Sequence, residues 1–344
     1  MTAYTLQKEL QSVVLPSGHR LAFAEYGKPN GRPVIYLHGF PMCRLEGMAF
    51  DVPASRANIR IIALDRPGIG RSSFVANRAI LDHAEDVRVL SQHLDLRRFG
   101  ILGVSGGAPY ALACARALPK ELLSGVGILS GMGTYEETDI GLVPMPSRVT
   151  GWLARNIPRT LRVVTDAFVA GLQRVVKWSW VQKRLDRFVG QAKQSKNAWE
   201  RDALGTLKQQ EADENWTATA SRERLLKAIF EPFHQGSEGV VQEAALVSQP
   251  WGFRLEEIEN TVTIWHGSKD TNAPIEWIRA MARKVPGAVL NEYEGDTHGS
   301  MVKHVDDVFG SLIHKVDGDY NDEASHMTLV HRHRAAPSTK VRSQ

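Results

Sequence analysis

This chain of 344 residues has few cysteines, no long apolar run and little excess of either charge. Its two cysteines, Cys43 and Cys114, are too few for a disulfide framework or a thiolate metal site, and they suit a reducing compartment. No stretch approaches the roughly 18 uninterrupted apolar residues of a membrane span. The start, MTAYTLQKELQSVV, lacks the basic segment and apolar run of a secretory leader. We therefore predict a cytoplasmic protein with no membrane span.

The charge balance and the absence of two kinds of motif exclude further classes of function. Lys and Arg number 42 against 38 Asp and Glu, a formal net charge of +4, so no strong field directs the chain towards nucleic acid. No Gly-x-Gly-x-x-Gly loop follows a predicted strand, and no cluster of His, Cys, Asp or Glu has metal-ligand spacing. We predict a protein without metal or cofactor that acts on a small molecule. The oligomeric state has no signal in the sequence.

Short apolar runs alternate with longer helical patterns along most of the chain. Residues 11–27 predict a β-hairpin around the turn Pro16, Ser17, Gly18. The later apolar runs are continuous rather than alternating, as in strands that are covered on both faces of a parallel sheet. They occupy residues 33–40, 59–70, 99–107, 122–133, 261–270 and 288–300, with helical patterns at 77–96, 108–118, 274–285 and up to about 316. This alternation predicts an α/β fold with a mainly parallel sheet and helices on both faces.

A long interruption, residues 132–255, follows the sixth predicted strand and differs in composition. It holds six of the eight tryptophans, namely Trp152, Trp178, Trp180, Trp199, Trp216 and Trp251. Its amphipathic stretches predict a helical cap inserted between two parts of a core, residues 1–131 and 256–316. Its many lysines and arginines are interpreted as a solvated face, with anion binding as the alternative. Residues 317–344 lack apolar periodicity, which predicts a disordered tail.

The segment ILGVSGGAPYALA, residues 101–113, places one hydroxyl group among small residues between a strand and a helix. Gly103, Ser105 and Gly107 match the Gly-x-Ser-x-Gly pattern of a nucleophile elbow, in which a tight turn exposes the serine oxygen. Bulky neighbours would clash in such a strained turn. The alternative is a strand-to-helix turn that serves packing alone. We predict that Ser105 is the nucleophile.

A serine nucleophile needs a histidine to take its proton and a carboxylate to orient that histidine. After an elbow serine, the expected chain order is Ser, acid, His. Asp270 and His298 each follow a predicted strand, so both should lie at the carboxyl edge of the sheet, where such folds bind ligands. We predict Asp270 as the acid and His298 as the base. Asp296, two residues before His298, and the pair Glu136 and Glu137 are the alternative acids.

Motifs in a fixed order make the chain resemble the α/β-hydrolase superfamily: HGFP, DRPGIGRSS, GVSGG, and the pair GSKD with GDTHGS. The resemblance covers about residues 13–316 and points to the capped, single-domain branch of esterases, lactonases and C–C hydrolases. It implies an α/β-hydrolase fold with a helical cap inserted after the sixth strand. It also implies an oxyanion hole made by the backbone N–H groups of Phe40 and Gly106, which would stabilise negative charge in the transition state. His38 then supports that loop.

The same resemblance narrows the reaction. A serine at the elbow excludes the haloalkane dehalogenases and epoxide hydrolases of this fold, which use an aspartate there. What remains is a serine hydrolase that cleaves an ester, a thioester, a lactone or a C–C bond through an acyl-enzyme. Relatives in fungal metabolite pathways and the tryptophan-rich cap favour a small apolar or aromatic, polyketide-like substrate and a place in secondary metabolism. The alternatives are a non-hydrolytic lyase and a ligand-binding receptor with slow turnover.

Overall fold

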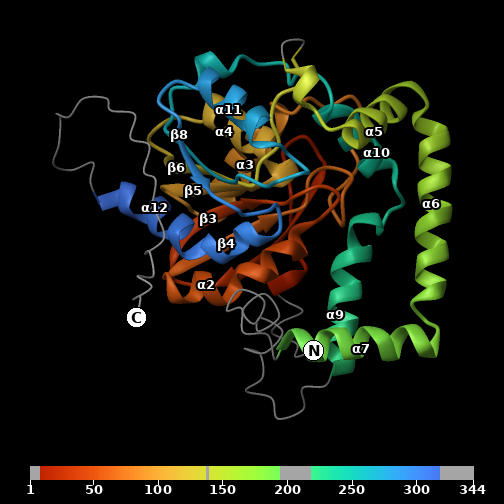
Figure 1. Ribbon diagram of the computed structural model, residues 1–344. Helices are drawn as coiled ribbons and strands as arrows, with labels where there is room; N and C mark the ends of the chain where they lie inside the picture. Colours follow the sequence, from red (N-terminus) through yellow and green to blue (C-terminus); the bar gives the residue numbers. More distant parts are fainter. Residues whose placement is uncertain (1–7, 137–138, 194–217, 318–344) are drawn as a thin grey trace, which may run out of the picture.

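The computed structural model describes residues 8–136, 139–193 and 218–317 (Figure 1). These residues form an eight-stranded sheet in the order β1-β2-β4-β3-β5-β6-β7-β8. Strand β2 pairs antiparallel with β1 and with β4, and the other pairings are parallel, which confirms the mainly parallel sheet. The strands are β1 Gln11–Val14, β2 Arg20–Gly27, β3 Arg32–Leu37, β4 Ile59–Leu64, β5 Phe99–Val104, β6 Leu123–Leu129, β7 Val262–Gly267 and β8 Val289–Tyr293.

Side chains that alternate along each strand explain why the sheet carries a helical layer on both faces. In β3, Ile35 and Leu37 belong to one apolar cluster, whereas Val34 and Tyr36 belong to another. Helices α3, α4 and α11 contribute to the first cluster, and α2, α12 and the 3-10 helix η1 contribute to the second. Their bounds are η1 Arg44–Phe50, α2 Asp51–Arg56, α3 Asp82–His93, α4 Ala108–Ala117, α11 Ile275–Lys284 and α12 Val305–Asp317. Burial on both faces is why these strands appear as continuous apolar runs in the sequence.

The helix predicted at 77–96 is shorter at both ends than its pattern indicated. Asn77 and Asp95 have φ values of +56° and +52°, in the left-handed region that an α-helix cannot contain. Helix α3 begins at Asp82 and ends at His93. The short segment that precedes it carries Arg78, whose guanidinium is buried.

The described part of the insertion 132–255 consists mainly of helices. It contains α5 Met145–Asn156, α6 Pro158–Val175, α7 Ser179–Lys193, α9 Ala218–Phe230 and α10 Glu238–Val247. Helix α5 packs on α10, α7 packs on α9, and α6 runs along the outside of the molecule (Figure 1). Trp199, Trp216, Glu137 and residues 318–344 of the predicted tail lie outside the described residues. Within the described ranges, no helix combines the length and the apolar character needed to cross a membrane.

Candidate active site

Ser105 lies at a tight turn between β5 and α4. Its φ of +52° is in the left-handed region, where a residue with a side chain is strained. Backbone atoms approach so closely that the flanking positions have no room for side chains. A Cβ on Gly103 would lie 2.7 Å from the carbonyl oxygen of Gly107, and a Cβ on Gly107 would lie 2.1 Å from that of Leu37. The Gly-x-Ser-x-Gly pattern therefore has a steric cause in this turn.

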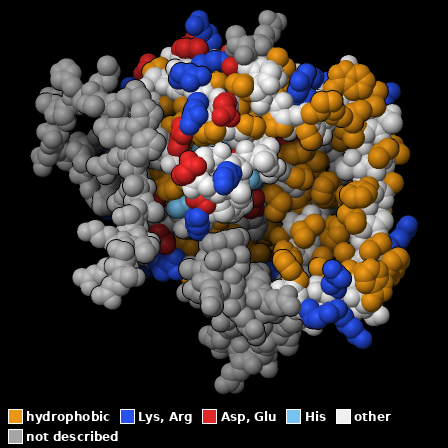
Figure 2. All heavy atoms as spheres, viewed as in Figure 1, with side chains coloured by type: hydrophobic (Ala, Val, Ile, Leu, Met, Phe, Trp, Pro, Cys, Tyr) orange, Lys and Arg blue, Asp and Glu red, His pale blue; other side chains and the backbone are white. Residues whose placement is uncertain are grey.

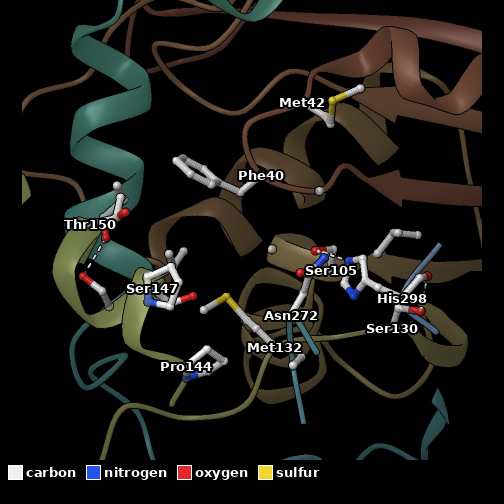
Figure 3. Close-up of a pocket in the computed structure, with 18 of the residues that line it drawn as sticks. Phe40, Met42, Ser105, Ser130, Met132, Pro144, Ser147, Thr150, Asn272 and His298 are labelled. Carbon is white, nitrogen blue, oxygen red and sulfur yellow. Dashed lines mark hydrogen bonds between the residues drawn. The ribbon is translucent and has the colours of Figure 1, made fainter. Parts of the chain in front are cut away.

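The structure brings Ser105, Asp270 and His298 together at one edge of the sheet. Strands β5, β6, β7 and β8 run parallel, so the residues that follow β5, β7 and β8 meet at their carboxyl ends. His298 Nε2 lies 3.1 Å from Ser105 Oγ, and His298 Nδ1 lies 2.7 Å from Asp270 Oδ2. Figure 3 shows Ser105 and His298 facing each other in a cavity. In this arrangement an imidazole can take the serine proton while the carboxylate orients the ring.

Asp270 is buried, and its two carboxylate oxygens have separate partners. The backbone N–H groups of Asn272 and Ala273 donate to Oδ1 at 2.8 and 2.9 Å, and Oδ2 faces His298. Burial raises the pKa of Asp270, but hydrogen bonds from His298 and Ala273 outweigh it and hold that pKa below its usual value. The carboxylate therefore stays charged and can stabilise a protonated His298. Nearby, the buried His266 Nε2 donates to the carbonyl of Ala273 at 2.7 Å, a structural role.

The alternative acids that the structure describes form ion pairs with other residues. Asp296 forms ion pairs with Lys303 at 2.5 Å and with His304 at 2.7 Å, both on the turn that follows it. Glu136 forms an ion pair with a lysine of α11 at 2.7 Å, and Glu137 lies outside the described residues. Among the candidate acids that the structure describes, the carboxylate after β7 is therefore the one hydrogen-bonded to the histidine.

Two backbone segments meet beside the serine. A Cβ on Gly106 would lie 3.0 Å from the backbone nitrogen of Phe40, so the elbow and the loop after β3 are in close backbone contact. Phe40, Gly106 and Ser105 line the same cavity, and Figure 3 shows Phe40 and Ser105 in it. The two residues predicted to form an oxyanion hole thus lie side by side next to the serine, where their N–H groups can stabilise a developing negative charge.

Buried polar side chains hold the loop of residues 38–40, hereafter the oxyanion loop. Glu46 Oε2 accepts hydrogen bonds from the Gly39 N–H at 2.7 Å and from a tyrosine hydroxyl of β3 at 2.8 Å. Arg66 donates to the carbonyl oxygens of His38 and Gly39 at 2.6 and 3.3 Å. The sequence analysis missed Glu46 and Arg66 as loop supports, because both act on backbone groups, which leave no pattern of side-chain types.

His38 completes this support. Its Nδ1 donates to the carbonyl oxygen of Gly39 at 2.8 Å, and the ring is buried. Burial and the adjacent Arg66 charge hold the pKa of His38 well below its usual value, so the ring is neutral at neutral pH. A neutral ring that is tied to the backbone fits a loop support.

A buried acid from the insertion anchors Arg66 in turn. Glu243, on α10, lies 2.7 Å from Arg66 Nε through Oε1, and its Oε2 accepts hydrogen bonds from Arg78 and Tyr110 at 2.6 and 2.7 Å. Burial raises the pKa of Glu243, but the charges of Arg66 and Arg78 outweigh it and lower that pKa. Earlier in the insertion, Glu231 accepts hydrogen bonds from two arginines of the core at 2.6 Å each. Both acids fasten the insertion to the core, and the sequence analysis missed both.

The cavity in front of Ser105 is mostly apolar and has a volume of about 610 Å³. Its apolar lining includes Phe40, Met42, Leu129, Met132, Tyr135, Val247 and Trp277. Helix α5 supplies one wall through Thr150 and Gly151, together with α10 through Val247, and the strand ends of the core supply the rest. A drug-sized apolar molecule matches a cavity of this size and lining.

The described tryptophans of the insertion do not lie where they would need to be to hold an aromatic substrate. None of the four that the structure describes is among the residues that line the cavity. Trp152, Trp178 and Trp180 are more than half exposed, and Trp251 is buried in the core cluster beneath α10. The aromatic rings at the cavity wall come instead from the oxyanion loop, from Tyr135 and from α11.

Among the residues that the structure describes, no group of three or more His, Cys, Asp or Glu side chains could hold a metal ion. The contacts of His298 with Ser105 and Asp270 support proton transfer and nucleophilic attack by the serine.

Comparison with known proteins agrees with the fold described above. The family model for the alpha/beta hydrolase fold matches residues 32–304. An esterase from Exiguobacterium antarcticum superposes with a TM-score of 0.54 at 18% identity, over 90% of this chain and 99% of that one. An enol-lactonase from Burkholderia xenovorans LB400 superposes with a TM-score of 0.55 at 16% identity, over 89% and 100%. At these identities the likeness shows the fold alone.

Curated relatives match shorter stretches. A proline iminopeptidase from Xylella fastidiosa is 33% identical over 108 residues, which cover 30% of this chain and 34% of that protein. The dihydrolipoyllysine-residue acetyltransferase component of the acetoin cleaving system from Pseudomonas putida is 36% identical over 120 residues, 35% of this chain and 32% of that protein. The chain thus spans about a third of the length of these curated relatives.

Proposed function

Because the chain belongs to the α/β-hydrolase family, we propose that it is a serine hydrolase working through an acyl-enzyme, with Ser105, His298 and Asp270 as its catalytic residues. The observation that carries this proposal is the pair of contacts of His298, at 3.1 Å to Ser105 Oγ and at 2.7 Å to Asp270 Oδ2. Hydrolase relatives support the general reaction, and the geometry supports these residue roles.

The contacts support a two-step reaction. Ser105 Oγ bonds to the substrate's carbonyl carbon while its proton moves to His298 Nε2, and the N–H groups of Phe40 and Gly106 stabilise the negative carbonyl oxygen. His298 then gives that proton to the leaving group as the carbonyl re-forms, which leaves an acyl-serine. Water attacks the acyl-serine, His298 takes the proton of the water, and Ser105 regains a proton as the acid product leaves. Asp270 orients and stabilises the charged imidazole throughout.

The cavity lining supports an ester, thioester or lactone with an apolar acyl part, and a C–C bond next to a carbonyl is the further possibility. Aliphatic, methionine and aromatic side chains surround the serine, so binding should strengthen with apolar size. Each CH₂ group buried contributes about 0.8 kcal/mol, roughly fourfold in kcat/KM. We expect kcat/KM to rise by about this factor per carbon along a series of p-nitrophenyl acyl esters until the cavity is filled. A flat series would contradict an apolar acyl site.

We also propose that residues 132–255 act as the cap of this site, since α5 and α10 line the cavity opposite the strand ends. A cytoplasmic location and a role in secondary metabolism stay predictions from the sequence.

A fluorophosphonate probe followed by mass spectrometry tests the nucleophile. We expect the label on Ser105, no labelling of Ser105→Ala, and full labelling of Ser147→Ala, a matched control that removes another hydroxyl at the cavity. Multiple turnover of a p-nitrophenyl ester then identifies a hydrolase. Labelling without turnover would favour the lyase or the slow ligand-binding protein, and an unlabelled Ser105 would contradict the mechanism.

A further inference from the structure

Large apolar side chains are exposed on the outer helices of the insertion. Val164, Phe168 and Leu172 on α6, together with Trp178, Trp180 and Phe188 on and next to α7, form what we call the outer patch. Phe168 is 63% exposed, and Trp180 and Phe188 are each 60% exposed. Figure 2 shows hydrophobic side chains gathered over this side of the molecule, with Lys and Arg near α7. Single exposed apolar residues are ordinary on a protein surface, but a gathered set marks an interaction site.

Within the part of the chain that the structure describes, α6 packs through a different side from this patch. Val164, Phe168 and Leu172 recur every four residues, so they share one side of the helix. A different side faces α10, because Val169 is buried and Asp166 accepts a hydrogen bond from the Ser237 N–H at 2.8 Å. A surface helix that only covers a core carries polar residues on its outer side. The apolar stripe of α6 is therefore available to a partner.

The same helices carry a concentrated excess of positive charge. Residues 158–193 contain eight Lys or Arg against two Asp, a net charge of +6, whereas the whole chain has +4. The rest of the chain is therefore net negative. On α7, the exposed Arg184 lies one helical turn from both Trp180 and Phe188, and Arg187 is exposed beside it. The partner of this surface should combine an apolar layer with negative charge.

We propose that α6 and α7 dock on an anionic membrane surface, with the outer patch at the boundary between lipid headgroups and acyl chains. Exposed aromatic and aliphatic side chains can insert below the headgroups of such a surface, while neighbouring Lys or Arg side chains reach the anionic headgroups. A second copy of the chain fits less well, because a symmetric contact through the outer patch would bring two segments of +6 together. Docking through charge and apolar insertion together also explains why the positive charge is concentrated on these two helices.

The position of α5 connects this surface to the site. Thr150 and Gly151 of α5 line the cavity, whereas Met145 and Trp152 of the same helix are more than half exposed. The helix that walls the cavity therefore has an apolar outer side, and it packs against α6. A docked protein would hold this wall near the lipid, where apolar esters concentrate. This last point rests on the proposed function, whereas the docking itself does not.

Sedimentation of the full-length protein with lipid vesicles tests the proposal. We expect binding to vesicles of phosphatidylcholine with 30% phosphatidylserine, weak binding to pure phosphatidylcholine, and loss of binding in 0.5 M NaCl because salt screens the charge. Replacing Arg184 and Arg187 by Gln should weaken binding about fivefold for each residue, since each basic group near an anionic surface contributes about 1 kcal/mol. The control Lys120→Gln with Arg254→Gln removes two exposed charges that lie outside α6 and α7, and it should bind as the wild type does.

A second pair of variants tests the apolar part. The triple change Phe168→Ser, Trp180→Ser and Phe188→Ser should lower binding at least tenfold. The control Val14→Ser with Val289→Ser removes exposed apolar side chains from the sheet and should change nothing. Thermal unfolding checks that every variant is folded, and ester turnover without vesicles should persist in all of them, which separates this proposal from the proposed function. Membrane docking would be overturned if the wild-type protein did not bind anionic vesicles. It would also be overturned if light scattering showed a dimer that forms through the outer patch.

Discussion

Replacing Glu243 by Gln should both destabilise the protein and slow its reaction. The change keeps the size of the side chain and removes one negative charge, which in the native protein lies 2.7 Å from Arg66 and 2.6 Å from Arg78. All three side chains are buried. The variant would therefore leave two buried guanidinium groups without their carboxylate.

The expected magnitude follows from that burial. Removing one partner of a buried ion pair costs about 3–5 kcal/mol, because the remaining charge stays out of water without compensation. Glu238 provides a matched control on the same helix, since its ion pair with Arg162 is about half exposed on both sides. For an exposed pair the cost is about 1 kcal/mol or less. We therefore expect Glu243→Gln to lower the free energy of unfolding by several kcal/mol more than Glu238→Gln does.

The effect on the reaction passes through Arg66. This guanidinium holds the carbonyl oxygens of His38 and Gly39, and the next residue supplies a proposed oxyanion-hole N–H. Loss of one such donor costs about 100-fold or more in kcat. We expect Glu243→Gln to lower kcat by up to about 100-fold with little change in KM, because the acyl cavity itself is intact.

Two assays check these values. Urea unfolding followed by tryptophan fluorescence measures the stability of both variants, and ester hydrolysis under conditions where both are folded gives kcat and KM. Equal stability of the two variants would refute the reasoning that Glu243 anchors α10 to the core. A normal kcat in a destabilised Glu243→Gln would instead separate that anchor from the oxyanion loop.

Three further predictions concern the catalytic residues and acid stability. Ser105→Ala should fold normally and lose about 10⁴-fold to 10⁶-fold in kcat, and a purified variant with more than a tenth of normal turnover would contradict the mechanism. Asp270→Asn should cost about 10⁴-fold in kcat through the wrong histidine tautomer, whereas Asp296→Asn should cost far less; the reverse order would reassign the acid. Burial lowers the pKa of His38 and of His266, so unfolding takes up protons on these rings below the unfolded pKa of about 6.5. The free energy of unfolding should therefore be highest above that pH and fall on acidification by up to about 2.7 kcal/mol per pH unit. An unchanged urea midpoint between pH 7.5 and 5.5 would contradict this.

Local sequence determined the parts of this protein that depend on neighbours in the chain. Continuous apolar runs marked the buried strands, because a strand covered on both faces has no polar side. The elbow could be predicted because Gly103 and Gly107 have no room for a Cβ, which leaves a five-residue pattern in the sequence. Chain order then pointed to an acid and a histidine, and the structure brings Asp270 and His298 to Ser105.

Contacts across the fold were decided by the tertiary structure alone. Asp296 is nearer than Asp270 to His298 in sequence, yet its carboxylate pairs with Lys303 and His304. Glu243 follows the elbow serine by more than a hundred residues and still supports the oxyanion loop through Arg66. An isolated Glu or Arg looks like any surface charge in the sequence. Its role depends on burial beside an opposite charge, and that burial arises only when the sheet and the helices of the insertion pack together.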